Sequence, residues 1–239
     1  MKHCILMLLH KDVKLANRLL KLYPKTFDIY IHIDKKSDIE QKDIVRLSNV
    51  VWIGKEIEVK WQSYEMVEAE LRLLQEAHKQ GYDYYHLISG QCLCLRTAEE
   101  FDDIICKYDG RSFVEKRFEM TDGKLYDKFM LGSQWWSLSK QTVYWIFEHW
   151  DKVQELDREY TKPIIAKDEM FFQTLLYNNV PKLLVNDNLR YINFFASVHP
   201  LLVGIDKYEM LMNGDFLFTR KVDFHSSLEL IDEVEQRLC

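Results

Sequence analysis

The sequence of 239 residues is poor in the residues that mark linkers and simple nucleotide-binding motifs. Its 8 glycines and 4 prolines are scattered singly, which excludes a flexible linker, a repeat array and a low-complexity tract. Neither GxGxxG nor GxxxxGK[ST] occurs, so a dinucleotide fingerprint and a P-loop have no support. An Asp-x-Asp sequence, the usual metal clamp on a sugar-nucleotide diphosphate, is also missing. Its absence disfavours a Mg²⁺- or Mn²⁺-dependent transferase.

Cysteines and blocks of like charge are also scarce. The 5 cysteines are odd in number and lack CxxC pairs, which favours reduced thiols in a cytoplasm over a disulfide framework. The formal net charge is −6 without a charged block, so neither nucleic-acid binding nor a polybasic membrane anchor is indicated. The apolar run after Lys2 is too short for a signal sequence or a membrane span, and we expect it to form a buried strand.

Short apolar runs alternate with amphipathic segments in the first half of the chain. They predict strands over 4–10, 27–34, 50–54, 84–89 and 112–118, and helices over 14–23, 63–81 and 97–108. Thr97 and Glu100 fit a capping box at the start of the last of these helices. This alternation predicts an α/β fold with a mostly parallel central sheet flanked by helices.

The second half of the chain is less regular. We expect strands over 132–139, 183–185, 190–195 and 216–221, helices over 140–156 and 166–176, and a C-terminal helix from about residue 224. The length and the hydrophobic content of 47% predict a single domain over residues 1–239.

Polar residues stand where the predicted parallel strands end, and ligands bind at that edge of such sheets. These residues are His10, Asp34 and Ser89. Two lysines follow Asp34, although a solvated loop would explain them as well. Two other groups have a possible chemical role, but packing explains them better. One is a metal site made of His3, Cys4 and His10. The other is a thiol site made of Cys92, Cys94 and His86.

Two adjacent acids, Asp168 and Glu169, precede the apolar run "MFFQTLL". One interpretation is structural, with Asp168 as a helix N-cap and both charges at the positive end of the helix dipole, worth about 1–2 kcal/mol. The other is that one acid is a catalytic base. Arg220 and Lys221, at the end of another apolar run, also have two interpretations. They are either a pair of surface charges or the cations of a ligand site.

A series of segments, taken in order, resembles the core-2/I-branching β-1,6-N-acetylglucosaminyltransferase family (glycosyltransferase family 14), in a bacterial form. The resemblance covers about residues 3 to 223. It rests on "IYIHIDKKS" (29–37), "VEAELRLLQEA" (67–77), "DYYHLISGQ" (83–91), "GSQWWSLS" (132–139), "DEMFFQTLL" (168–176), "LRYINF" (189–194), "HP" (199–200) and "FLFTRKVD" (216–223).

The resemblance implies a GT-A-like fold and a transferase that inverts the anomeric centre of a UDP-sugar without a metal ion. A basic pair then neutralises the departing diphosphate. Matched by motif, Glu169 is the general base, and Lys221, assisted by Arg220, binds the diphosphate. The remaining matches are His10, Asp34, Trp61 and Ser89 at the nucleotide end, and Glu115 and Asp168 at the acceptor end.

The sequence departs from the family pattern at three points. Cys92 stands where the family usually has Asp after "SGQ". The arginine that animal members place well upstream of the lysine has no clear counterpart, and Arg190 and Lys207 are candidates. The anchor, stem and disulfide cysteines of Golgi members are absent. We therefore expect a cytoplasmic enzyme, with at most a peripheral membrane contact through a lipid-linked acceptor.

The predicted function is transfer of a sugar, N-acetylglucosamine in the first place, from a UDP-sugar to a glycan acceptor hydroxyl. No cofactor, metal or nucleic-acid partner is expected. One alternative is a degenerate member that binds a sugar nucleotide or glycan without transferring it, favoured only by Cys92. The other is a transferase of the same class with another donor, such as UDP-xylose.

Overall fold

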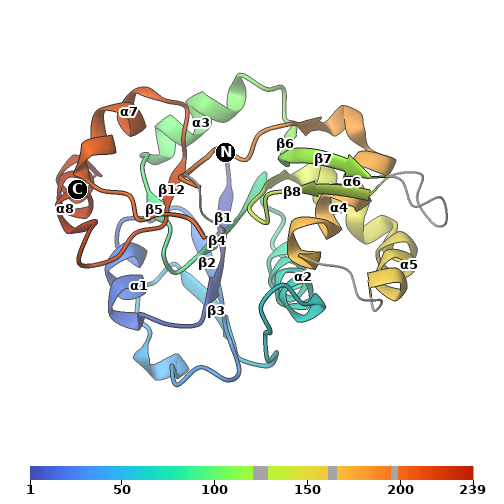
Figure 1. The fold of residues 1–239 in the computed structure, drawn as a ribbon, viewed down its shortest axis with the longest axis horizontal. Coiled ribbons are helices and arrows are strands. Elements are labelled where there is room, and N and C mark those ends of the chain that lie inside the picture. The colour runs from blue at the N-terminus through green and yellow to red at the C-terminus, as the bar shows by residue number, and fades with distance from the viewer. Residues whose placement is uncertain (121–128, 161–165, 195–198, 239) are drawn as a thin grey trace.

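The computed structural model describes residues 1–120, 129–160, 166–194 and 199–238 (Figure 1). Within these ranges a seven-stranded sheet has the order β10-β6-β9-β4-β1-β2-β3. Only β9 runs against the others, because it pairs antiparallel with both β4 and β6. The predicted α/β fold with a mainly parallel sheet is confirmed. The strands are β1 (His3–Leu9), β2 (Asp28–Ile33), β3 (Val50–Gly54), β4 (Tyr84–Ser89), β6 (Ser112–Phe113), β9 (Ser137–Ser139) and β10 (Leu184–Val185).

Helices cover both faces of this sheet, and successive residues of β1 point to opposite faces. Ile5 and Met7 join the core under α1 (Val13–Leu20), α3 (Ala98–Cys106) and α8 (Leu228–Leu238). Cys4 and Leu6 join the core under α2 (Tyr64–His78), α4 (Lys140–Glu148), α5 (Trp150–Tyr160) and α6 (Phe171–Asn179). Figure 1 shows these two groups of helices on opposite sides of the sheet.

Two smaller sheets adjoin the main one. A three-stranded sheet joins β11 (Arg190–Ile192), β12 (Phe218–Arg220) and β5 (Leu93–Cys94). Beyond it lies α7 (Tyr208–Asn213). A hairpin joins β7 (Lys116–Met120) to β8 (Phe129–Gly132). Reciprocal bonds between Val222 and Gln91 fix β12 to the loop that follows β4.

Several predicted boundaries are wrong. The strand expected over 112–118 is divided into β6 and β7, since the chain turns at Glu115 and crosses Gly132 so closely that a Cβ there would lie 1.7 Å from the Glu115 carbonyl oxygen. The strand expected over 132–139 is likewise interrupted, because Ser133 Oγ accepts a bond from Trp135 N at 3.3 Å and turns the chain. Position 195 of the predicted strand 190–195 lies outside the described residues.

Two helix predictions also need correction. The helix expected over 140–156 is divided at His149, whose backbone (φ −117°, ψ 45°) leaves the helical region. The helix expected over 166–176 begins only at Phe171, after the 3₁₀ turn η2 (Lys167–Glu169). Asp168 lies inside that turn and makes no side-chain capping bond, so its interpretation as an N-cap is wrong. The capping box of Thr97 and Glu100 is confirmed.

No helix in the described part of the chain is long and apolar enough to cross a membrane.

Candidate active site

The carboxyl ends of β1, β2, β4 and β6 meet at one edge of the main sheet. His10 directly follows β1, Asp34 directly follows β2, Ser89 ends β4, and Glu115 comes two residues after β6. Because β9 runs the other way, its start brings Gln134 and Trp135 to the same edge. The topology therefore gathers at one edge four residues that the sequence placed in the site.

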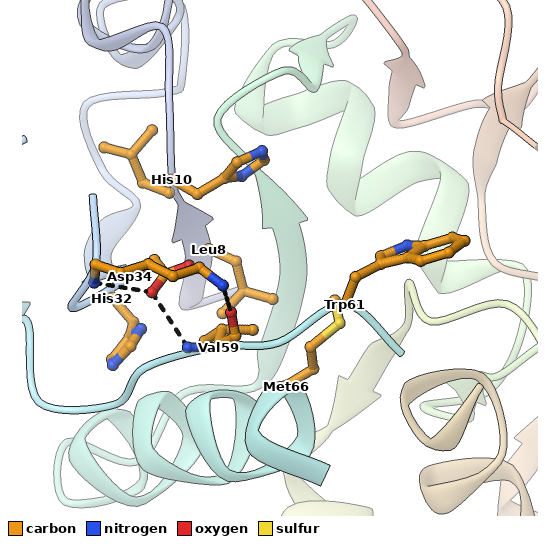
Figure 2. A pocket seen from close by; sticks show the side chains of 9 residues that line it. Leu8, His10, His32, Asp34, Val59, Trp61 and Met66 are labelled. Carbon is orange, nitrogen blue, oxygen red and sulfur yellow. Dashed lines mark hydrogen bonds and ion pairs between the residues drawn. The ribbon is translucent and has the colours of Figure 1, made fainter. Parts of the chain in front are cut away.

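A pocket of about 210 Å³ opens at the ends of β1 and β2 (Figure 2). Asp34 Oδ1 accepts bonds from Lys36 N at 3.2 Å and from Val59 N at 3.1 Å, which draws the segment after β3 over the pocket. Drug-sized ligands occupy about 300–1,000 Å³, so the pocket suits one ring system rather than a whole sugar nucleotide. Its lining is Leu8, Leu9, His10, His32, Asp34, Lys36, Val59, Trp61 and Met66.

Trp61 lies at the outer rim of this pocket. Its side chain is 67% exposed and points away from Asp34 in Figure 2. Its ring centroid lies 5.6 Å from that of His199, so the chain between β11 and α7 approaches the rim. An exposed aromatic face at a pocket rim is a natural stacking surface for a planar ring.

Cations gather between this pocket and the end of β4. The pKa of Lys221 is lowered by partial burial and by the neighbouring charges of Lys11 and Arg220. The pKa of His10 is lowered by burial, then by Lys11 and Lys221. The sequence analysis did not identify Lys11. Its position directly after His10, at the end of β1, could have indicated it as a site residue.

The Arg220 guanidinium lies over the Trp135 ring, with its carbon 4.2 Å from the ring centroid. Its Nε is buried, and no hydrogen-bond partner for it occurs in the described ranges. Burial lowers the pKa of Arg220, while Cys92 and Glu169 favour its charged form. The cation is therefore fixed in place by stacking while its polar edge stays available.

Glu169 lies half-buried at the end of η2, between two groups of charge. Burial raises its pKa, Glu115 raises it further, and Arg117 and Arg220 partly offset both effects. The charges that act on Glu169 therefore come from β7, from the segment before β7 and from β12. A carboxylate with a raised pKa at such a position is a candidate general base.

Glu115 is fixed by two partners. Its carboxylate accepts a bond from Arg117 Nε at 2.6 Å and another from the Asn188 amide. It lines a polar pocket of about 240 Å³ together with Arg117, Asn186, Asp187, Asn188, Arg190 and Ile192. Amides and carboxylates of this kind suit the hydroxyl groups of a sugar.

Asp168 is more deeply buried than Glu169, with an exposed fraction of 6%. Burial, followed by the charge of Glu169, raises the pKa of Asp168 to about 6. Nearby, Glu70 of α2 is fully buried and accepts a bond from Gln134 Nε2 at 2.8 Å. Burial raises the Glu70 pKa well above its ordinary value. The acceptor-binding role of Asp168 stays a prediction.

The two candidates for the upstream arginine lie elsewhere. Arg190 is buried and donates to the carbonyl oxygens of Leu87 and Trp136 at 3.0 and 2.7 Å and to Ser137 Oγ at 2.8 Å, so it cross-links the sheet. Lys207 is exposed and pairs with Asp206 at 2.9 Å. Neither is among the charges that act on Lys221, whose neighbours are Lys11, Arg220 and Asp12.

Except for His10, which lines the pocket of Asp34, the other candidates are buried and packed. His3 bonds to His86 at 3.0 Å and to Asp102 at 2.8 Å, and Cys92 and Cys94 are buried. Among the residues that the structure describes, no three His, Cys, Asp or Glu side chains are grouped as metal ligands would be.

Comparison with known proteins agrees with this geometry. The profile of the core-2/I-branching enzyme family matches residues 5–211. The chain belongs to the core-2/I-branching enzyme family. Human xylosyltransferase 2 is 26% identical over a region that covers 77% of this chain. This chain spans only about a quarter of that relative, since the match covers 25% of its length.

The fold is similar to that of a solved glycosyltransferase. The crystal structure of the apo-form glycosyltransferase GlyE from Streptococcus pneumoniae TIGR4 aligns with a TM-score of 0.50 at 10% identity, covering 98% of this chain and 60% of that one. At this identity the likeness concerns the fold alone, whereas the family match concerns the sequence.

Proposed function

We propose that this chain is an inverting, metal-independent glycosyltransferase that moves N-acetylglucosamine from a UDP-sugar to a hydroxyl group of a glycan acceptor. The observation that carries the proposal is that Glu169 is near both Arg220 and the Glu115–Arg117 pair, whose charges act on it. A base in an inverting transfer needs a cation near the leaving group and a polar site for the acceptor.

The chemistry assigned to Glu169 is proton abstraction. Its carboxylate takes the proton of the acceptor hydroxyl while that oxygen attacks the anomeric carbon of the donor from the face opposite the diphosphate. The bond between the anomeric carbon and the diphosphate breaks, and UDP departs with the electron pair. A pKa raised by burial makes Glu169 a stronger base than an exposed Glu.

Stabilisation of the departing diphosphate is assigned to Lys221 and Arg220. Both are partly desolvated, which strengthens their interaction with an anion compared with a fully solvated lysine or arginine. The stack on Trp135 fixes the Arg220 side chain before the donor binds. The side chain therefore loses less conformational entropy when the transition state forms.

The two pockets are assigned to opposite ends of the reaction. We assign the pocket of Asp34, His10 and Trp61 to the uracil and ribose of the donor, with Ser89 near the junction. The polar pocket of Glu115 is assigned to the acceptor sugar. Cytoplasmic synthesis of a surface glycan, with a lipid-linked acceptor as the only membrane contact, fits this assignment.

A second donor, UDP-xylose, is favoured by one observation: the human relative is a xylosyltransferase. Donor choice depends on a few contacts around the sugar ring, which family membership does not fix. Cys92 is the sole basis for a non-catalytic alternative, in which the chain binds a sugar nucleotide or glycan without transfer.

The test is a screen of nucleotide sugars followed by a transfer assay. A ligand at about 100 times its Kd stabilises a protein by about 2.7 kcal/mol, so the correct donor should stand out in melting curves. Incubation of that donor with glycan acceptors in excess EDTA should then yield product of inverted configuration by NMR. Stabilisation by UDP-sugars without transfer to any acceptor, or a product of retained configuration, would contradict the proposal.

A further inference from the structure

The β1–α1 loop directly adjoins the segment that contains Lys221. Gly90 N donates to Leu8 O at 3.0 Å, so the loop after β4 lies against the end of β1. That contact is close, because a Cβ at position 90 would lie 2.5 Å from Leu9 Cδ1. On its other side the same loop bonds to the segment after Lys221, through Val222 N and Gln91 O at 3.2 Å. One loop therefore fixes the ends of β1 and β12 beside each other.

His10 lies where two pockets meet. It lines the pocket of Asp34 and also a second, more open hollow of about 460 Å³, which includes Lys11, Asp12 and Phe224. Lys11 therefore faces the space just outside the pocket assigned to the base and ribose.

Lys11 and Lys221 are like charges on these two adjoining segments, and the charge of Lys11 acts on Lys221. Within the described ranges neither lysine forms an ion pair with a carboxylate, although the charge of Asp12 also acts on Lys221. Their mutual repulsion, together with that of Arg220, disfavours the empty site. Binding of an anion removes this repulsion, so a local surplus of cations on a protein of net charge −6 points to an anionic ligand.

We propose that Lys11 is a diphosphate-binding residue of this chain and supplies, from the β1–α1 loop, the cation that neither Arg190 nor Lys207 provides. The ligand class is a nucleoside diphosphate, which the ammonium group of Lys11 would contact together with Lys221. This inference rests on the proposed function, because it assigns Lys11 to the leaving group of that reaction.

Titration of the unliganded protein with uridine, UMP and UDP tests the inference. Lys11→Ala should weaken UDP binding about tenfold at low salt, UMP less, and uridine not at all, because only the phosphates meet the lysine. Lys11→Arg should restore most of the UDP affinity, since it keeps the charge. Lys25→Ala is the matched control, because Lys25 is also exposed but precedes β2, at the opposite edge of the sheet.

The outcomes separate the two proposals. UDP binding that is unaffected by Lys11→Ala would overturn this inference alone. Equal loss of uridine and UDP binding would also overturn it, because Lys11 would then support the pocket rather than bind phosphate. If the unsubstituted chain bound no uridine nucleotide at all, the proposed function would fail, and the inference with it.

Discussion

Replacement of Asp168 by Asn should stabilise the protein, and increasingly so as the pH rises. Burial raises the pKa of Asp168 from 3.8 to about 6. Between these two values the unfolded chain has already lost a proton that the folded chain still binds. Stability contributed by this group is therefore complete below about pH 4, and falls as the pH rises to about 6. Above about pH 6 Asp168 is a buried carboxylate in the folded protein, and it lowers the free energy of unfolding by a constant amount.

The size of the effect follows from the same values. One pKa unit corresponds to about 1.4 kcal/mol, so the rise from 3.8 to about 6 represents a cost of about 3 kcal/mol above pH 7. At pH 5 the cost is only about half as large. The advantage of Asp168→Asn should thus grow by about 1.4 kcal/mol between pH 5 and pH 8, or by about 3–6 °C in melting temperature for a protein of this size.

Thermal unfolding of both proteins at pH 5 and pH 8 provides the measurement. Comparison of the two pH values cancels packing differences between Asp and Asn, because these do not depend on pH. A melting-temperature difference that stayed constant between pH 5 and pH 8 would show that Asp168 titrates as an exposed carboxylate. A variant that lost its advantage at high pH would show that Asp168 is paired with a cation.

Further predictions concern the assigned roles. Lys221→Ala should weaken UDP binding and cost about 2–4 kcal/mol in the transition state, with a milder effect of Arg220→Ala, as steady-state kinetics would show. Transfer should continue in excess EDTA with little gain from Mn²⁺, and loss on chelation that Mn²⁺ restores would contradict the basic-pair assignment. The rate should fall with decreasing pH at a midpoint above 4.5, because burial raises the pKa of Glu169; a pH–rate profile checks this. Cys92→Asp should bring no gain in transfer, whereas activity gained from an inactive starting protein would favour the non-catalytic alternative.

The sequence predicted the first half of the fold well because its elements form local patterns. The bounds of β3 and β4 agree with the apolar runs 50–54 and 84–89, and the Thr97 capping box marks the start of α3. β4 is buried along its whole length, and parallel strands buried on both faces have continuous hydrophobic runs.

The predictions failed where a tertiary contact decides the local structure. The division at Glu115 depends on its close crossing with Gly132, and the late start of α6 depends on η2 packing against α2. Such contacts join residues far apart in the chain, and periodicity does not reveal them. Propensity at "KDEM" favours a helix start, but the buried position of Asp168 overrides it.

The site was predicted in part for a similar reason. Strand ends identified His10, Asp34 and Ser89, and motif resemblance identified Glu169 and Lys221. The role proposed for Lys11 depends on contacts between the ends of β1, β4 and β12, which are more than 70 residues apart in sequence. The burial of Glu70 beneath the site is also a property of the packed structure alone.

The turnover of Glu169→Gln tests the central claim most directly. Gln keeps the shape of Glu and is a fair helix former, but it cannot take the proton of the acceptor hydroxyl. With a working donor and acceptor, kcat should fall about 10²–10⁴-fold while the UDP-sugar Kd and the melting temperature stay close to those of the unsubstituted protein. Transfer at a nearly unchanged rate, or an activity loss that merely follows a loss of stability, would show that Glu169 is not the catalytic base.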